Sequence, residues 1–184
     1  MKIGYISWTV VVLFVGFAAC KDSKKASAEK LVTEWIGKEI IFPPGSDCSK
    51  MGEDTPCPNL SHTPYKVLVY TDSVGCTSCR LNLHVWKAYM EEIDTLASGK
   101  VDFLFYFQPK NRKELDHLLK RDKFEHTVFI DEKGEISQIN NFPEEMEYQS
   151  FLLDRENNVL SVGNPVMNTK MWEVYKQVIT STHE

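Results

Sequence analysis

An apolar run that ends in a pair of cysteines is the feature that most restricts how this chain can fold. Residues 65–71 are rich in β-branched and aromatic side chains, Cys76 comes directly after Gly75, and Cys79 follows three residues later. Further on, apolar residues recur at three- and four-residue intervals, which is typical of one face of an amphipathic helix: Trp86, Tyr89, Met90, Ile93 and Leu96. The sequence therefore predicts a strand, a two-cysteine turn and a helix, with Cys76 in the first helical turn.

This position has a chemical consequence for the two thiols. The unpaired N–H groups and the positive dipole at a helix start stabilise a thiolate, which is the nucleophile in disulfide exchange. Cys79 is about one turn further on, lies on the same face and can close a disulfide with Cys76. A redox pair is the favoured interpretation; the alternatives are a structural disulfide, an inert remnant, and half of a metal site. Zinc needs four nitrogen or sulfur ligands, and the sequence has no second Cys-x-x-Cys and no His-x(3–5)-His. We expect no metal and no cofactor, with His84 a partly exposed polar residue.

The first 20 residues have the pattern of a targeting segment. Lys2 supplies a positive charge, residues 8–17 are almost continuously apolar, and small residues precede Cys20. The apolar run is short for a transmembrane helix, so we expect cleavage, with an uncleaved anchor as the alternative. A cysteine directly after small residues resembles the lipobox of bacterial lipoproteins. That resemblance implies a signal peptide at residues 1–19, a mature chain that starts at an acylated Cys20, and a folded part held at a membrane outside the cytoplasm.

Charge and cysteine number restrict the class of the mature chain. Without Lys2 it carries 20 Lys and Arg against 26 Asp and Glu, a net charge of −6, which argues against nucleic acid as a partner. The 165 residues after the signal peptide suit a single domain with a sizeable core. Besides Cys20 there are four cysteines, an even number that can pair in an oxidising compartment.

Between the signal peptide and the apolar run, the sequence predicts mostly connecting structure. Residues 20–28 form the lipidated Cys20 and a Lys/Ser/Ala-rich tether, and residues 29–36 have a helical stripe. Residues 39–42 predict a short strand, and the following residues up to Pro64 predict a loop of about 20 residues. Domain boundaries follow: an N-terminal helix, short strand and Cys-containing loop over residues 29–64, and one folded domain over residues 65–184.

That loop contains Cys48 and Cys57. A disulfide between them would close a small ring and stabilise the fold by about 2–3 kcal/mol through loop entropy. It is either a structural disulfide or a second redox pair that exchanges with Cys76 and Cys79.

Downstream of the central helix, strands and helices alternate. Residues 101–107 predict a strand buried on both faces, and Asn111 can cap a helix from Arg112 to about Lys123 that buries Leu115, Leu118 and Leu119. Then follow a strand at residues 127–130, a short helix or turn at 131–141, and a hairpin at 149–163. The closing helix at 170–180 buries an apolar stripe: Met171, Trp172, Val174, Tyr175 and Val178. His117 and His126 are expected at the surface. The fold class is α/β, a mixed central sheet with helices on both faces.

This order of elements resembles the thioredoxin fold, from about Tyr65 to the C-terminus. More closely it is similar to membrane-tethered thioredoxin-like oxidoreductases and peroxiredoxin-like proteins of bacterial envelopes. Beyond the two cysteines, the resemblance depends on residues 151–154 with the turn after them and on residues 162–165. It implies Cys76 as the attacking thiolate, Cys79 as the resolving thiol, and exported proteins with disulfides or thiols as partners.

Three positions depart from the family pattern. The cis-proline of the family falls on Tyr148, and because a non-proline cis bond costs about 2.5–4 kcal/mol, we expect a trans peptide and a differently shaped loop there. Gly75 replaces the aromatic residue usual before the first cysteine. Tyr70 stands where many thioredoxins have a buried acid that aids proton transfer, with Asp72 nearby.

These observations favour a thiol–disulfide oxidoreductase acting on other exported proteins. The missing proline and the Pro-rich loop motivate the alternative of a non-catalytic thioredoxin-like binding module. A thiol peroxidase is the third hypothesis: Ser73 occupies the Thr/Ser position of the peroxiredoxin pattern, whereas Val69 stands where that pattern has proline.

Overall fold

The computed structural model describes residues 25–60, 63–74 and 81–181. The chain divides into two compact units, residues 1–35 and 36–184. In the first unit residues 25–35 are helical, so the helix predicted at residues 29–36 begins four residues earlier, within the predicted tether. Lys25 pairs with Glu29 one turn away at 3.7 Å. Among the described residues, no helix has the length and apolar character needed to cross a membrane.

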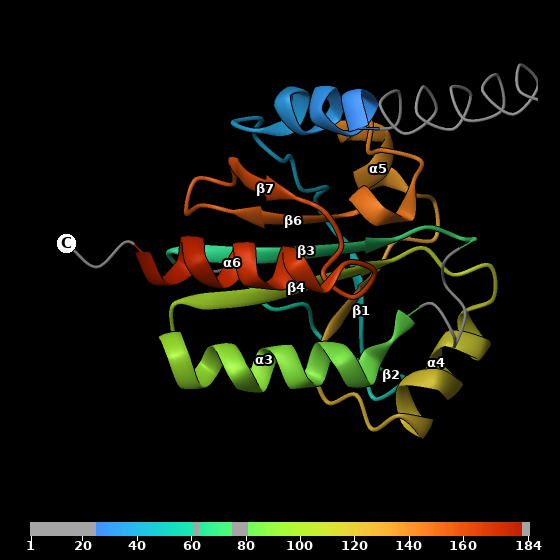
Figure 1. Cartoon of the computed structure of the whole chain (residues 1–184). Coiled ribbons are helices and arrows are strands. Elements are labelled where there is room, and N and C mark those ends of the chain that lie inside the picture. Colours follow the sequence, from blue (N-terminus) through green and yellow to red (C-terminus); the bar gives the residue numbers. More distant parts are fainter. Residues whose placement is uncertain (1–24, 61–62, 75–80, 182–184) are drawn as a thin grey trace, which may run out of the picture. The chain divides into compact units, whose positions relative to one another are not determined.

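The second unit is built on one seven-stranded sheet in the order β2-β1-β5-β4-β3-β6-β7 (Figure 1). Three neighbouring strands are parallel: β3 (Tyr65–Thr71), β4 (Val101–Phe107) and β5 (Val128–Ile130). Antiparallel strands extend the sheet on both sides: β1 (Asp47–Lys50), β2 (Glu53–Asp54), β6 (Ser150–Leu153) and β7 (Val159–Val162). The mixed sheet confirms the predicted fold class.

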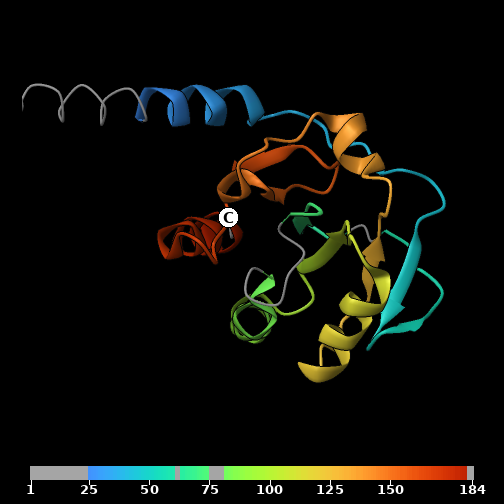
Figure 2. The ribbon, with the colours of Figure 1, turned by 90° about the vertical axis from the view of Figure 1, so that its right-hand side faces the viewer.

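Helices cover both faces of this sheet (Figures 1 and 2). One face packs against α3 (Leu83–Ala97), α4 (Arg112–Arg121) and α6 (Thr169–Ser181). The other face carries α5 (Glu135–Asn140) and the 3-10 helix η1 (Met146–Tyr148) beside it. α3 starts at Leu83, after Asn82 in the left-handed conformation (φ 46°). The first turn of α3 therefore comes after both cysteines of the pair in sequence.

Strand β4 supplies side chains to both layers, because successive residues of a strand point to opposite faces. Phe103 and Phe105 meet the Trp86 ring of α3 at centroid distances of 6.5 and 5.8 Å. On the other face, Tyr106 stacks on Phe129 of β5 at 4.5 Å. The prediction of a strand buried on both faces is confirmed.

Local sequence signals also account for α4 and for the hairpin. The Asn111 side chain accepts a hydrogen bond from Lys113 N at 3.1 Å, and the three predicted leucines are buried. Strands β6 and β7 form the predicted hairpin, with Asn157 in its turn at φ 70°. The buried Lys66 ammonium donates to the Arg155 carbonyl at 2.8 Å, which holds this turn against β3.

The apolar stripes of α3 and α6 differ from prediction at one residue each. Leu96 is 50% exposed and Val174 is 40% exposed, whereas Ala97 and Ile179 are buried. Each buried residue lies one helical turn, four residues, after a buried one of the predicted stripe, so the contact with the sheet follows the helix period.

The prediction of a strand at residues 39–42 is wrong. Glu39 makes one isolated bridge to Asn158. The Asn140 side chain accepts a hydrogen bond from Ile41 N and donates one to the Ile41 carbonyl, each at 2.8 Å. Because Ile41 bonds to a side chain and Pro43 has no N–H, strand pairing cannot continue. The prediction of an unstructured loop up to Pro64 is also wrong, since β1 and β2 lie within it.

Candidate functional site

The candidate site lies at the carboxyl ends of the parallel strands. Thr71 ends β3 and lies in register with Phe107 of β4, which is in register with Ile130 of β5. The chain leaves this edge at Asp72 and continues toward Cys76 and Cys79. Both cysteines and Gly75 lie outside the described residues, as does Cys20, so the described site consists of the groups around this exit.

Asp72 organises the start of the cysteine segment. Its Oδ1 atom accepts a hydrogen bond from Val74 N at 2.9 Å, which closes a turn typical of aspartate, and its Oδ2 atom lies 3.4 Å from Gln149 Nε2. Asp72 is therefore held between the exit of β3 and the loop before β6. Ser73, the residue of the peroxiredoxin pattern, is half-buried in the same turn, and Val69 of that pattern is buried in β3.

Tyr70 occupies the position at which the family often has an acid. Its hydroxyl donates to Gln108 Oε1 at 2.8 Å, and its ring contacts Phe142 at 5.2 Å. Burial raises the pKa of Tyr70 to about 12, so this hydroxyl stays protonated near neutral pH. Tyr70 is a buried hydrogen-bond donor and does not replace a proton-accepting carboxylate.

The loop that faces this exit contains Tyr148, the position of the family cis-proline. Tyr148 ends η1, and the described residues contain no cis peptide bond, as expected for a non-proline residue. Gln149 follows and is 2% exposed; its Nε2 atom donates to the Pro143 carbonyl at 3.0 Å, and its backbone carbonyl accepts from Tyr70 N at 3.0 Å. Gln149 thus holds the loop in shape by hydrogen bonds instead of by a cis-proline ring.

A cavity of about 450 Å³ opens between this loop and the end of β3. It is lined by Tyr70, Asp72, Val74, Ser137, Phe142, Pro143, Glu144, Met146 and Gln149. The buried Gln149 Oε1 atom accepts no hydrogen bond from the described residues. Sequence reasoning missed Gln149, because a single polar residue before a strand gives no local signal of burial.

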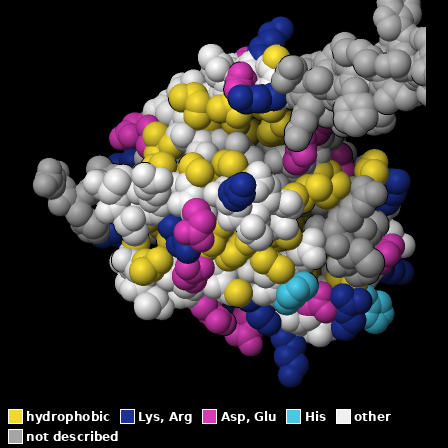
Figure 3. Space-filling view, in the orientation of Figure 1, with side chains coloured by type: hydrophobic (Ala, Val, Ile, Leu, Met, Phe, Trp, Pro, Cys, Tyr) yellow, Lys and Arg dark blue, Asp and Glu magenta, His cyan; other side chains and the backbone are white. Residues whose placement is uncertain are grey.

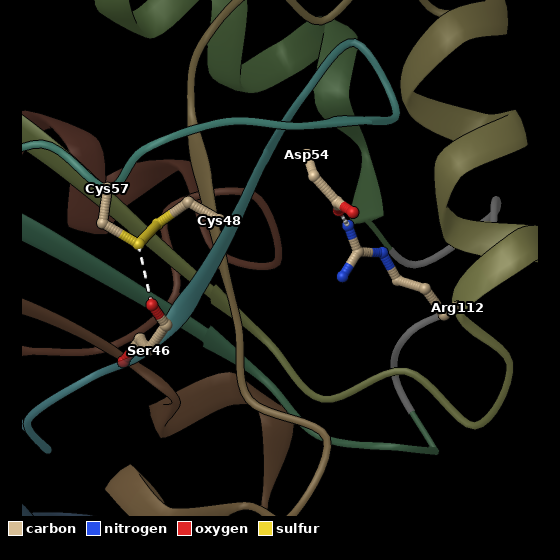
Figure 4. Close-up of a disulfide and its surroundings, with 5 residues drawn as sticks. All are labelled: Ser46, Cys48, Asp54, Cys57 and Arg112. Carbon is tan, nitrogen blue, oxygen red and sulfur yellow. Dashed lines mark hydrogen bonds and ion pairs between the residues drawn. A yellow bond between two sulfur atoms is a disulfide. The ribbon is translucent and has the colours of Figure 1, made fainter.

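The second cysteine pair is joined. Cys48 and Cys57 form a disulfide with their Cα atoms 5.2 Å apart, beside a cavity of about 380 Å³ that Arg112 also lines (Figure 4). The Arg112 guanidinium donates to Asp54 at 2.7 Å and to Asp116 at 2.9 Å, so it connects β2 to α4.

The histidines divide by environment. His117 and His84 are exposed, as expected. The prediction that His126 is a surface residue is right only in part: the residue is half-buried, its ring packs edge-on against Phe105 at 5.4 Å, and Nε2 lies 2.7 Å from the Phe103 carbonyl. Burial lowers the pKa of His126 below its ordinary value of 6.5. Within the described part of the chain, no group of three or more His, Cys, Asp or Glu side chains has the arrangement of a metal site.

Comparison with known proteins identifies the fold. No family model matches the sequence. No curated protein matches it either. A solved structure of a putative thiol-disulfide oxidoreductase from Bacteroides vulgatus is 16% identical, covers 77% of this chain and 93% of its own, and has a TM-score of 0.51.

Two further structures agree with this result. Peroxiredoxin Q from Xanthomonas campestris is 17% identical over 79% of this chain and 98% of its own, with a TM-score of 0.51. An uncharacterized thioredoxin-like protein from Porphyromonas gingivalis is 10% identical over 80% and 97%, with a TM-score of 0.53. At these identities the likeness concerns the fold alone, and the fold of this chain is thioredoxin-like.

Proposed function

We propose that this thioredoxin-like chain is an exported, lipid-anchored thiol–disulfide oxidoreductase that acts on disulfides of other exported proteins. Cys76 is the attacking thiolate and Cys79 the resolving thiol. The observation that carries the proposal is the position of the described cavity. It lies at the carboxyl end of β3, where the chain enters the segment that contains both cysteines.

Chain geometry supports this assignment. Cys76 comes two residues after Val74, which lines the cavity, so their Cα atoms are at most about 7 Å apart. Cys79 comes two residues before the buried Leu81, and the same limit applies. A disulfide of a partner protein that binds in this cavity beside Val74 is therefore near the start of the segment that contains Cys76.

The reaction is a two-step exchange. The Cys76 thiolate attacks one sulfur of the partner's disulfide, forms a mixed disulfide and releases the other partner sulfur as a thiolate. The Cys79 thiolate then attacks the Cys76 sulfur, which releases the second partner sulfur. The partner gains two electrons and two protons and becomes a dithiol, while Cys76 and Cys79 become a disulfide. In the opposite direction the same steps oxidise a partner.

Reduction of insulin by dithiothreitol tests the activity. We expect the full chain to accelerate the reduction and Cys76→Ser to abolish the acceleration, because the serine hydroxyl does not form the nucleophilic anion. Ser73→Ala is a matched control on the same segment and should retain activity. Equal rates for the wild type and Cys76→Ser would exclude the proposal and favour the binding module.

The partner can be identified by trapping. Cys79→Ser cannot resolve the mixed disulfide, so it should accumulate covalent adducts in intact cells that non-reducing gels and mass spectrometry detect. The double variant Cys76→Ser/Cys79→Ser should show none of them. A peroxidase would instead form sulfenic acid on Cys76 with hydrogen peroxide, which a sulfenic-acid probe measures.

A further inference from the structure

The Cys48–Cys57 disulfide has one accessible end and one protected end. Cys48 lies in β1 opposite Phe129 of β5 and is only 3% exposed. Cys57 follows β2, is exposed and lines the 380 Å³ cavity. Because exchange requires a thiolate to approach one sulfur directly, an external thiol has access to Cys57 and not to Cys48.

The segment that carries this disulfide is closed by other interactions as well. Thr55 N donates to the Cys48 carbonyl at 3.0 Å, and β1 pairs with β2 at two residues and with β5 at three. Arg112 connects Asp54 of β2 to α4. These contacts hold the segment to β5 and α4 besides the S–S bond, so we expect it to keep its shape when that bond is broken.

The disulfide also lies toward the end of the sheet at which the parallel strands terminate. Through the strand register, Cys48 aligns with Phe129, Tyr106 and Tyr70. Three strand spacings place the Cα atoms of Cys48 and Tyr70 about 14 Å apart. β2 runs antiparallel to β1 and returns toward the carboxyl ends of the parallel strands, so Cys57 lies at the same end of the sheet as the exit of β3.

We propose that Cys48–Cys57 is a second thiol-exchange site, which accepts two electrons from a dithiol protein at Cys57. The partner's thiolate attacks Cys57 Sγ, a mixed disulfide forms, and Cys48 leaves as a thiolate and takes up a proton. The partner's second thiolate attacks its own sulfur in the mixed disulfide and releases Cys57. The partner is oxidised to a disulfide, and this chain is reduced to two thiols.

The backbone is arranged to receive the released thiol. The Ser46 carbonyl oxygen lies 2.9 Å from Cys57 Sγ (Figure 4). Once reduced, Cys57 can donate its S–H to this oxygen. The proposal concerns other cysteines than Cys76 and Cys79, so it can hold or fail independently of the function proposed above.

The test uses the full chain as Cys76→Ser/Cys79→Ser, in which Cys48–Cys57 is the remaining pair. A reduced synthetic Cys-x-x-Cys peptide is added, and mass spectrometry measures peptide disulfide and chain thiols. We expect one peptide disulfide for each chain reduced, with an unchanged circular dichroism spectrum. If the pair stays oxidised under excess peptide, or if its reduction unfolds the chain, the disulfide is structural and the proposal is overturned.

Variants that keep one cysteine of this pair, with Cys20→Ala added so that no other thiol remains, test which sulfur is attacked. In the same background, Cys48→Ser exposes the Cys57 thiol and Cys57→Ser leaves the Cys48 thiol buried. We expect glutathione disulfide to modify Cys57 at least tenfold faster than Cys48 in the folded chain, and at equal rates in denaturant. Equal or reversed rates in the folded chain would contradict attack at Cys57.

Discussion

Single buried polar residues decide much of the local behaviour of this protein. Tyr70, Gln149 and Asp72 hold the exit of β3 by hydrogen bonds between the strand end and the loop that precedes β6. Each has a hydrogen-bond partner distant in sequence: the Tyr70 hydroxyl bonds to Gln108, and Gln149 bonds to Asp72. The same holds for His126, whose ring fills a gap between aromatic side chains of β4 and the segment after α4.

His126 makes stability depend on pH in a defined direction. Burial lowers its pKa in the folded chain below the ordinary 6.5, so between these two values the unfolded chain binds more protons than the folded one. The free energy of unfolding should therefore fall on acidification below pH 6.5, with His126 contributing at most about 1.4 kcal/mol per pH unit. Above pH 6.5 the titration of His126 should have no effect on the free energy of unfolding.

Thermal unfolding of His126→Gln between pH 7 and 5 measures this effect. The quantity compared is the slope of the free energy of unfolding against pH, and not its value at one pH. This slope should be shallower in the variant than in the wild type. His117→Gln, at an exposed position of α4, should keep the wild-type slope. Identical slopes for all three proteins would exclude the role of His126.

At the scale of elements, side chains join helices to their neighbours. Glu92 of α3 accepts a hydrogen bond from Trp172 Nε1 and another from Lys176 Nζ of α6, both at 2.6 Å. On the other face of the sheet, Asn140 of α5 bonds to both backbone groups of Ile41. These connections fix the positions of the helices beyond what apolar packing specifies.

Glu92→Gln should lower the free energy of unfolding by about 1 kcal/mol. This value is low for a hydrogen bond to a charged group because the Glu92 side chain is 40% exposed and solvent screens its charge. The Lys176 and Trp172 hydrogen bonds lower the pKa of Glu92 below 4.5. Its contribution is therefore complete above pH 4.5 and is lost as the pH falls through the lower folded value. Urea unfolding at pH 7 and 3 should show a difference from wild type that shrinks at pH 3; a constant difference would contradict this account.

Asn140→Ala should destabilise the fold by about 2 kcal/mol, because it leaves the N–H and C=O groups of Ile41 without their partner. Gln138→Ala, at an exposed position of the same helix, should cost much less. Urea unfolding measures both, and hydrogen exchange should show faster exchange of the Ile41 amide in Asn140→Ala alone. Equal losses in the two variants would show that helix propensity is the cause.

At the scale of the whole molecule, acidic and basic side chains are interspersed on the face shown in Figure 3. The formal net charge of the chain is −5. The proposed attachment to a membrane therefore depends on acyl chains at Cys20, since each buried CH₂ contributes about 0.8 kcal/mol.

We expect Cys20→Ala to abolish incorporation of labelled palmitate in cells and to move the chain out of the membrane fraction. Cys57→Ser is the control and should remain labelled and membrane-bound. Palmitate incorporation into Cys20→Ala would contradict lipidation at this residue and would favour acylation elsewhere.

The sequence by itself determined the elements whose signals are local. The apolar runs of β3 and β4, the Asn111 cap of α4 and the β6–β7 hairpin depend on residues a few positions apart, and periodicity and turn chemistry are sufficient to predict them. The order of these elements also predicted a mixed α/β sheet, and it resembled the thioredoxin fold that the structure has.

Only the tertiary structure decided the remainder. Strand β1 has the sequence Asp47–Lys50, which lacks an apolar alternation, and it is a strand because the edge of β5 supplies its backbone partners. Cys48, His126 and Gln149 lie where they do because of contacts with residues distant in the chain. Long-range pairing and burial are properties of the assembled sheet, so no local pattern of residues encodes them.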